Sequence, residues 1–145
     1  MRLWHRELLP YLPDAQFKGQ LRELVAVMRS WRDTGKTNHL LINRVMEYSK
    51  SELSSYALKY FSECTERRIS VNQDIVKEFC EFGYGEPIKH NKIFDGWHNK
   101  EYLRVCVCNL YEKYHFGVGK SKISQEEWNR VLQGYKEITG EDWVL

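Results

Sequence analysis

The residues that could do chemistry together are concentrated in the first 24 positions, MRLWHRELLPYLPDAQFKGQLREL. They are the α-amine of Met1, the arginines Arg2 and Arg22, and the carboxylate of Glu23. An α-amine has an ordinary pKa of about 8, so part of it is unprotonated at neutral pH and can attack an aldehyde-like carbon to form an imine. A carboxylate can assist the proton transfers that follow, and arginines can hold phosphates bidentately. The residue types alone do not assign this chemistry, because an Arg-Glu pair on a helix is usually a surface ion pair.

A helix must present Arg22 and Glu23. Pro13 stops a helix from running straight through the N-terminus, and Asp14 fits an N-cap. Apolar residues then recur at helical spacing, which predicts a helix over about residues 14–31. Glu23 is about 200° around this helix from its apolar stripe and so faces away from the core. Gly19, one turn earlier, fits either close approach of a ligand or backbone, or a tight contact between helices.

The rest of the chain shows helical patterns and little alternation. We expect further helices over about residues 37–49, 51–68, 72–79, 99–115 and 124–139. The last has the clearest start, where Ser124 and Glu127 form a capping box, and Gly140 follows it as a stop signal. The fold class is therefore all-α. We expect a compact single-domain bundle of about five to six helices over residues 1–145, with the N-terminal segment packed on or between helices.

The charge is unevenly distributed. The formal net charge is only +2, but residues 1–50 hold nine Lys and Arg against five acids, and the remaining 95 residues are net acidic. A basic patch on a near-neutral protein points weakly to a partner that bears phosphates, although a solvated charged face is equally ordinary. Residues 83–97 combine lysines, His90 and aromatic residues, so they form a candidate nucleic-acid contact or a simple connector.

Several other classes of protein are disfavoured. No run is apolar and long enough to span a bilayer, and the first ten residues lack the apolar core of a signal peptide, so we expect a cytoplasmic protein without a membrane partner. The cysteines lack the CxxC spacing of zinc sites, so no metal ligand is assigned and buried free thiols are expected. The four cysteines are Cys64, Cys80, Cys106 and Cys108.

The N-terminal stretch resembles the pyrimidine-dimer DNA glycosylase family, the endonuclease V-like enzymes. The matching features are the MRLW start with arginine directly after the first residue, the turn leading into a helix, and the LREL at residues 21–24. The segment from His39 to Cys64 resembles the middle helices of the family in length and pattern. The likeness covers about residues 1–70 and is closer still to uncharacterised bacterial relatives that begin MRLWH.

The resemblance implies a DNA repair glycosylase and AP lyase that acts on pyrimidine-dimer or abasic sites in double-stranded DNA. We further expect a monomer that uses no cofactor. The nucleophile of the family is the α-amine of the first mature residue, which here is Met1. We expect Met1 to be retained, because Arg2 is too large for the initiator to be removed. The catalytic glutamate of the family falls on Glu23. The phosphate-gripping arginines of the family fall on Arg2 and Arg22. Arg29, Arg32 and Lys36 are further expected DNA contacts because they are basic residues in the same part of the chain.

One position departs from the family pattern. A family arginine three residues after the glutamate meets Ala26 here, and Arg29, one turn later, is the candidate substitute. Two accessory residues are also considered. His5 lies near the nucleophile and is a candidate proton relay or a structural hydrogen-bonding group. His39 is a candidate contact to the exposed nucleotide, or a cap at the start of the second helix.

Two other functions remain open. A non-catalytic nucleic-acid-binding module of the same fold would use the basic residues only as phosphate contacts, and its binding would be indifferent to Glu23→Gln. A helical protein-interaction domain would instead present an apolar patch, for example around Trp128 and Tyr135, and would not bind DNA. The sequence does not specify which lesion is excised.

Overall fold

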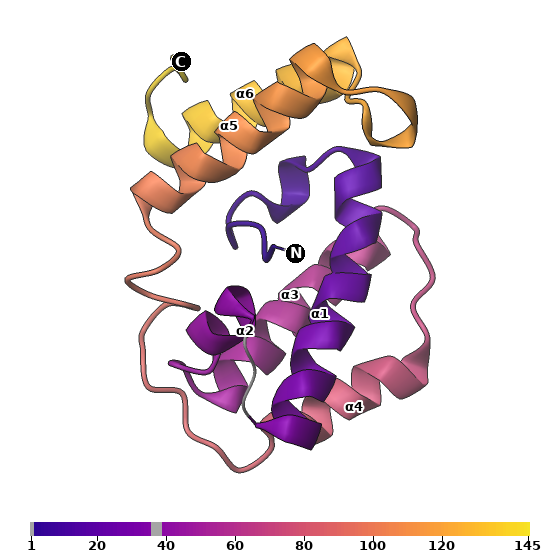
Figure 1. Cartoon of the computed structure of the whole chain (residues 1–145), viewed down its shortest axis with the longest axis vertical. Coiled ribbons are helices and arrows are strands. Elements are labelled where there is room, and N and C mark those ends of the chain that lie inside the picture. Colours follow the sequence, from indigo (N-terminus) through magenta and orange to yellow (C-terminus); the bar gives the residue numbers. More distant parts are fainter. Residues whose placement is uncertain (1, 36–38) are drawn as a thin grey trace. The chain divides into compact units, whose positions relative to one another are not determined.

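The computed structural model describes residues 2–35 and 39–145, which form helices and connecting loops without a β-strand (Figure 1). The expected all-α class is confirmed. The described part of the chain contains α1 (Asp14–Thr34), α2 (Leu40–Val45), α3 (Lys50–Glu66), α4 (Gln73–Gly83), α5 (Lys100–Phe116) and α6 (Gln125–Thr139). Two short 3-10 helices, η1 (Leu9–Tyr11) and η2 (Gly119–Ser121), lie in the connections.

The chain divides into two compact units. The first unit comprises Met1–Leu3 and Leu21–Asp95, and the second comprises Trp4–Gln20 and Gly96–Leu145. The division falls inside α1, so the first turns of this helix belong to the second unit and its longer remainder belongs to the first. A single domain over residues 1–145 stays a prediction.

Helix α1 carries the predicted core stripe. Phe17, Leu24 and Met28 are fully buried, as their helical spacing predicts, whereas Leu21, expected in the same stripe, is only half-buried. The helix continues three residues beyond the predicted end, to Thr34, whose hydroxyl donates a hydrogen bond to the carbonyl oxygen of Ser30 at 2.6 Å. Gly35 then adopts a φ of +65°, the left-handed conformation in which glycine commonly ends a helix.

The second predicted helix is shorter than expected. The predicted range of 37–49 starts at a position outside the described residues, and α2 ends at Val45. Ser49, the last residue of the predicted range, is extended and caps α3. Its hydroxyl accepts from the backbone N–H of Glu52, while the Glu52 carboxylate accepts from the backbone N–H of Ser49. Since an N-cap residue cannot continue a preceding helix, the break between α2 and α3 is local in origin.

Three predicted signals for the boundaries of helices are present, two at helix starts and one at a helix end. Asn72 caps α4 by accepting from the backbone N–H of Asp74 at 2.8 Å. Ser124 and Glu127 form the predicted capping box of α6, and Gly140 ends that helix with a φ of +77°. These signals depend on hydrogen bonds between neighbours in the chain, so the sequence reveals them reliably.

The N-terminal segment packs on helices of the second unit, as expected. The backbone N–H of Trp4 donates to the side-chain oxygen of Gln20 on α1 at 2.8 Å. The Arg6 guanidinium donates to the carbonyl oxygen of His98, just before α5, at 2.7 Å. On α6, a Cβ at Gly134 would lie 2.4 Å from a ring carbon of Tyr11, so only glycine lets η1 approach this closely.

Candidate active site

Arg22 and Glu23 lie on α1 within the first unit, which also contains Arg2. Arg22 is exposed, whereas Arg2 and Glu23 are half-buried. Met1, the expected nucleophile, lies outside the described residues. Three of the four groups expected to act together therefore belong to one compact unit, although they come from two stretches of the chain about 20 residues apart.

The side chains of Arg22 and Glu23 do not form the ordinary surface ion pair. Within residues 2–35 and 39–145, neither side chain takes part in a hydrogen bond or an ion pair. The Glu23 carboxylate is therefore available to a ligand and is not engaged in holding the described fold.

Gly19 lies one turn before Glu23 on α1, and space is open beside it. No described atom outside its local backbone lies within 4 Å of where a Cβ at Gly19 would be. The tight helix contact that could have required glycine is therefore absent among the described residues. Close approach of a ligand to this face of α1 stays a prediction.

Arg29 and Arg32, two further expected DNA contacts, are already paired with acidic side chains. Arg29 and Arg32 both reach Glu78 on α4, at 2.9 Å and 3.4 Å. Arg32 also pairs with Asp33 at 2.9 Å. Glu78 is 46 to 49 residues away in sequence, so the pattern of α1 gave no sign of this pairing.

The paired charges shift one another's pKa values. The hydrogen bond from the Arg29 guanidinium holds the pKa of Glu78 below its ordinary value, and that from Arg32 does the same for Asp33. Glu78 in turn raises the pKa of Arg29. These four side chains therefore carry two positive and two negative charges together, and they present less positive potential to a phosphate than the arginines alone would.

The histidines have different environments. His5 is buried in the second unit, where its ring stacks on His98 at 5.3 Å between centroids and its Nδ1 accepts from the backbone N–H of Glu7 at 3.1 Å. These contacts support the structural alternative for His5. His39 is exposed at the N-cap position of α2 and makes no capping hydrogen bond with its side chain. Lys36 lies outside the described residues.

A pair of titratable side chains that the sequence did not indicate lies in the first unit. The carboxylate of Glu52 is 1% exposed, and Nδ1 of His90 lies 3.1 Å and 3.2 Å from its two oxygens. The Ser49-to-Glu52 spacing was a readable capping signal. The contribution of His90, which is 38 residues farther along the chain, could not be inferred because it depends on how the loop after α4 folds back.

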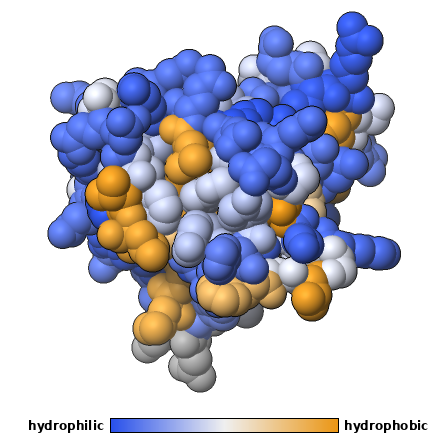
Figure 2. All heavy atoms as spheres, turned by 90° about the horizontal axis from the view of Figure 1, so that it is seen from above, coloured by the Kyte–Doolittle hydropathy of each residue, from blue (hydrophilic) through white to orange (hydrophobic). Residues whose placement is uncertain are grey.

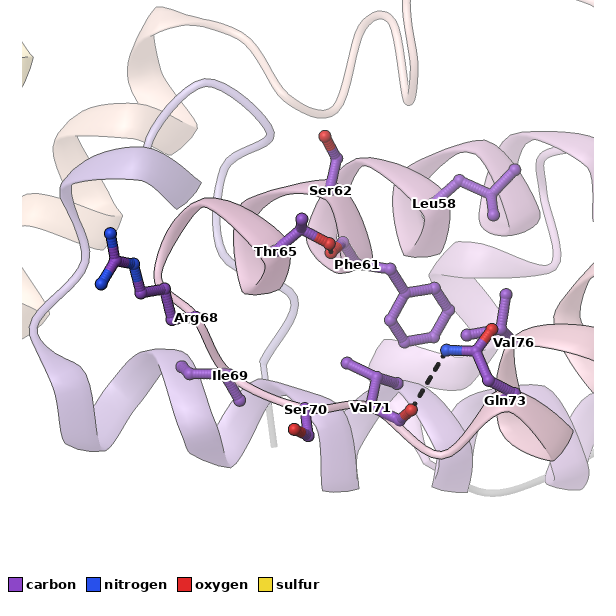
Figure 3. Close-up of a pocket in the computed structure, with 10 residues that line it drawn as sticks. All are labelled: Leu58, Phe61, Ser62, Thr65, Arg68, Ile69, Ser70, Val71, Gln73 and Val76. Carbon is purple, nitrogen blue, oxygen red and sulfur yellow. Dashed lines mark hydrogen bonds between the residues drawn. The ribbon is translucent and has the colours of Figure 1, made fainter.

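A cavity of about 620 Å³ lies at the junction of α3, the following loop and α4 (Figure 3). Phe61 projects toward it from α3 and Val76 from α4, and Arg68 lies at the opposite end from Val76. The predicted site residues that the structure describes do not line this cavity. It therefore adds no group to the candidate site around Glu23.

The remaining sequence expectations concern cysteines, metals and membranes. Cys64 and Cys106 are buried and Cys80 and Cys108 exposed, and burial raises the pKa of the Cys64 thiol. The described residues contain no group of three or more His, Cys, Asp or Glu side chains arranged to hold a metal ion. They also contain no helix that is both long and apolar enough to cross a membrane.

The apolar patch expected of a protein-interaction domain is not built on the predicted residues. Trp128 and Tyr135 are 5% and 0% exposed, so neither offers a surface to a partner. On the face seen in Figure 2, hydrophobic residues form several separate groups among hydrophilic ones. Scattered apolar residues are normal on a protein surface and do not indicate an interface.

Comparison with known proteins gives one match. No curated protein and no solved structure is significantly similar to the chain. The family model for pyrimidine dimer DNA glycosylase matches residues 1–77, slightly more than half of the 145 residues. The matched range includes the N-terminal stretch, Arg22 and Glu23, and it agrees with the resemblance found in the sequence. The chain therefore belongs to the pyrimidine dimer DNA glycosylase family.

Proposed function

We propose that this protein is a pyrimidine-dimer DNA glycosylase and AP lyase that works through an imine on the α-amine of Met1, with Glu23 assisting. The observation that carries the proposal is that the carboxylate of Glu23 has no partner among the described residues. It lies beside the exposed Arg22 within the range that matches the family model. A carboxylate kept available at this position suits proton transfer better than stabilisation of the fold.

The reaction proceeds in two stages. In the first, the unprotonated α-amine attacks C1′ of the damaged nucleotide, the C1′–N glycosidic bond breaks, and the base leaves with the bonding electron pair and takes up a proton. Loss of a proton from the amine nitrogen and opening of the sugar ring give the imine between that nitrogen and C1′. In the second, the imine acidifies C2′; loss of a C2′ proton forms the C2′–C3′ double bond, and the C3′–O bond breaks to release the 3′ phosphate.

Glu23 serves both stages as a group that moves protons and offsets positive charge. The cationic imine is stabilised by a nearby carboxylate, and the same carboxylate can accept or return the protons that the two stages transfer. Arg2 and Arg22 hold the flanking phosphates, which fixes the register of C1′ relative to the amine. Double-stranded DNA is the expected partner, and the lesion must be drawn out of the base stack for the amine to reach it.

Borohydride trapping tests this proposal. Protein with a free, untagged N-terminus is mixed with a labelled duplex that contains one abasic site, and borohydride reduces any imine to a stable covalent adduct. We expect an adduct with the unmodified protein and none after the N-terminus is acetylated or extended by one residue. Salt-sensitive DNA binding without an adduct would instead establish a non-catalytic binding module.

The lesion is tested separately from the lyase stage. Duplexes that carry a pyrimidine dimer, an abasic site or no damage are compared at equal concentration. We expect strand cleavage on the first two and not on the third. Cleavage of the abasic duplex alone would restrict the activity to AP lyase.

A further inference from the structure

The loop between α4 and α5 is fixed to the start of α3 by a series of hydrogen bonds. The backbone N–H of Lys50 donates to the Glu86 carboxylate at 2.9 Å, and the Ser51 hydroxyl donates to the carbonyl oxygen of Gly83 at 2.9 Å. Farther along, the Tyr48 hydroxyl donates to the carbonyl oxygen of Asp95 at 2.7 Å. All of these residues belong to the first unit. The loop therefore has a conformation that is defined by hydrogen bonds to the residues around the start of α3.

A strained residue shows how firmly this conformation is held. Phe94 has a φ of +56°, a left-handed conformation that is unfavourable for a bulky side chain. Its ring is fully buried and lies 5.3 Å from that of Tyr48 and 5.5 Å from that of Tyr56. Aromatic packing offsets the strain, and the segment before Phe94 is thereby held in one shape.

His90 lies in that segment and connects a buried carboxylate to the solvent. The side chain of His90 is 38% exposed, whereas the carboxylate of Glu52 behind it is 1% exposed. When its carboxyl group is ionised, Glu52 only accepts hydrogen bonds, and Nδ1 of His90 is then the donor between them. The capping box with Ser49 fixes the carboxylate in turn. The ring nitrogen of His90 that can contact a ligand is therefore Nε2. The hydrogen bond between Nδ1 and Glu52 fixes the orientation of the ring.

The residues around His90 are basic. Lys89 and Lys92 are exposed, and residues 87–94 contain no acidic side chain. Neither lysine has an ion-pair partner in the described part of the chain. This arrangement contrasts with Arg29 and Arg32, whose charges are paired with Glu78 and Asp33. The loop presents its positive groups on a backbone that the structure already holds in place.

We propose that His90, Lys89 and Lys92 form a second DNA contact, in which Nε2 of His90 donates to a phosphodiester oxygen and the lysines neutralise neighbouring phosphates. Because Nδ1 holds the first hydrogen, Nε2 donates only in the imidazolium form, and the Glu52 carboxylate offsets that charge. Glu52 is thus a positioning residue. The inference rests on the proposed action on DNA, and it extends the contact to residues beyond the range 1–77 that matches the family model.

Two substitutions at one position separate a binding role from a structural one. In His90→Asn, the amide nitrogen can replace Nδ1 as the donor to Glu52, but no group replaces Nε2. In His90→Gln, the amide falls near Nε2, and the buried carboxylate loses its donor. We expect His90→Asn to weaken binding to an undamaged duplex about fivefold to tenfold at pH 6 with little change in Tm. His90→Gln should lower Tm more and weaken DNA binding less.

Substituting Lys89 and Lys92 provides a second test, which measures how DNA affinity depends on salt and leaves the contact between His90 and Glu52 intact. The double substitution Lys89→Gln and Lys92→Gln should reduce the slope of log affinity against log salt by about 0.9 for each phosphate that the protein no longer neutralises. The matched control is Lys120→Gln with Lys122→Gln, which removes the same charge from exposed positions in the second unit. The control should leave the slope near that of the unmodified protein.

The outcomes separate this inference from the proposed function. If His90→Asn and the Lys89/Lys92 variant bind DNA as the unmodified protein does, the second contact is overturned even when imine trapping succeeds. If the unmodified protein binds no DNA and gives no adduct, the proposed function fails and the second contact fails with it. Weaker binding with an unchanged rate of the chemical step at saturating DNA supports the second contact.

Discussion

Two regions of α1 carry similar charged residues, but the charges are unpaired in one region and paired in the other. At Arg22 and Glu23, the arginine and the carboxylate have no partner among the described residues. Two turns later, Arg29 and Arg32 are paired with Glu78 of α4, and Arg32 also with Asp33. Both turns belong to the first unit. The difference shows that an arginine in the sequence does not tell whether its charge is available, because a helix remote in sequence can supply the counter-charge.

This pairing also changes the meaning of the basic first third of the chain. Residues 1–50 hold an excess of four positive charges, but part of that excess is met by an acid from α4. The positive potential available to DNA is therefore concentrated at fewer residues than the count suggests. We expect Arg22 to contribute more to binding than Arg29 and Arg32.

The largest effect is expected on the rate of strand cleavage, when the carboxylate of Glu23 is removed and compared with that of Glu78. Glu23→Gln should lower the rate of strand cleavage about 100-fold or more, because a positioned proton-transfer group contributes about 10² to 10⁴. Glu78→Gln should change this rate less than about threefold, because its carboxylate stabilises an ion pair. Single-turnover cleavage of an abasic duplex at saturating protein measures both. Equal rates in Glu23→Gln and the unmodified protein would remove Glu23 from the mechanism.

The next effect concerns the arginines. Arg22→Ala should weaken DNA binding about tenfold, because it removes a charge-assisted contact to phosphate. Arg29→Ala should weaken binding less than about threefold, because that guanidinium is already held by Glu78. Fluorescence anisotropy with a labelled duplex gives both dissociation constants at one salt concentration. A greater loss from Arg29→Ala would show that DNA displaces Glu78 from its pair.

A smaller effect, an increase in DNA affinity, is expected when the ion pair between Arg29 and Glu78 is removed. Glu78→Gln leaves Arg29 without its partner on α4 and increases the positive charge of this face. We expect affinity for an undamaged duplex to rise about twofold to threefold, with a steeper dependence on salt. Glu66→Gln, an exposed acidic position on α3, serves as the charge-matched control. An equal rise in the control would attribute the effect to net charge alone.

The smallest effect is a shift in titration. The pKa of Glu78 is expected to lie below the ordinary value for glutamate and to return toward it in Arg29→Ala, because the Arg29 hydrogen bond is the leading cause. Carboxyl carbon chemical shifts followed against pH measure this directly. Since the folded pKa is lowered, the pair stabilises the fold above the ordinary glutamate pKa, and that contribution is lost as the pH falls through the folded pKa. An unshifted Glu78 would mean that the ion pair does not persist in solution.

Local signals in the sequence predicted much of the fold. The capping residues Asn72 and Ser124, the stop at Gly140 and the apolar stripe of α1 are all present where expected. Each depends on hydrogen bonds within a few residues or on the helical repeat, so the neighbouring sequence contains the necessary information. The second helix ends at Val45, earlier than predicted, and the capping box of Ser49 and Glu52 stops any helix from continuing through position 49.

The sequence by itself determined the all-α class, the family resemblance and the candidate catalytic group around Glu23, because these depend on short patterns and on residue identity. Only the tertiary structure decided which charges are available and which are paired. Glu78 reaches Arg29 across 49 positions, and His90 reaches Glu52 across 38. The physical reason is that ion pairs depend on distances of a few ångströms, and such distances between remote segments are set by how the helices and loops pack.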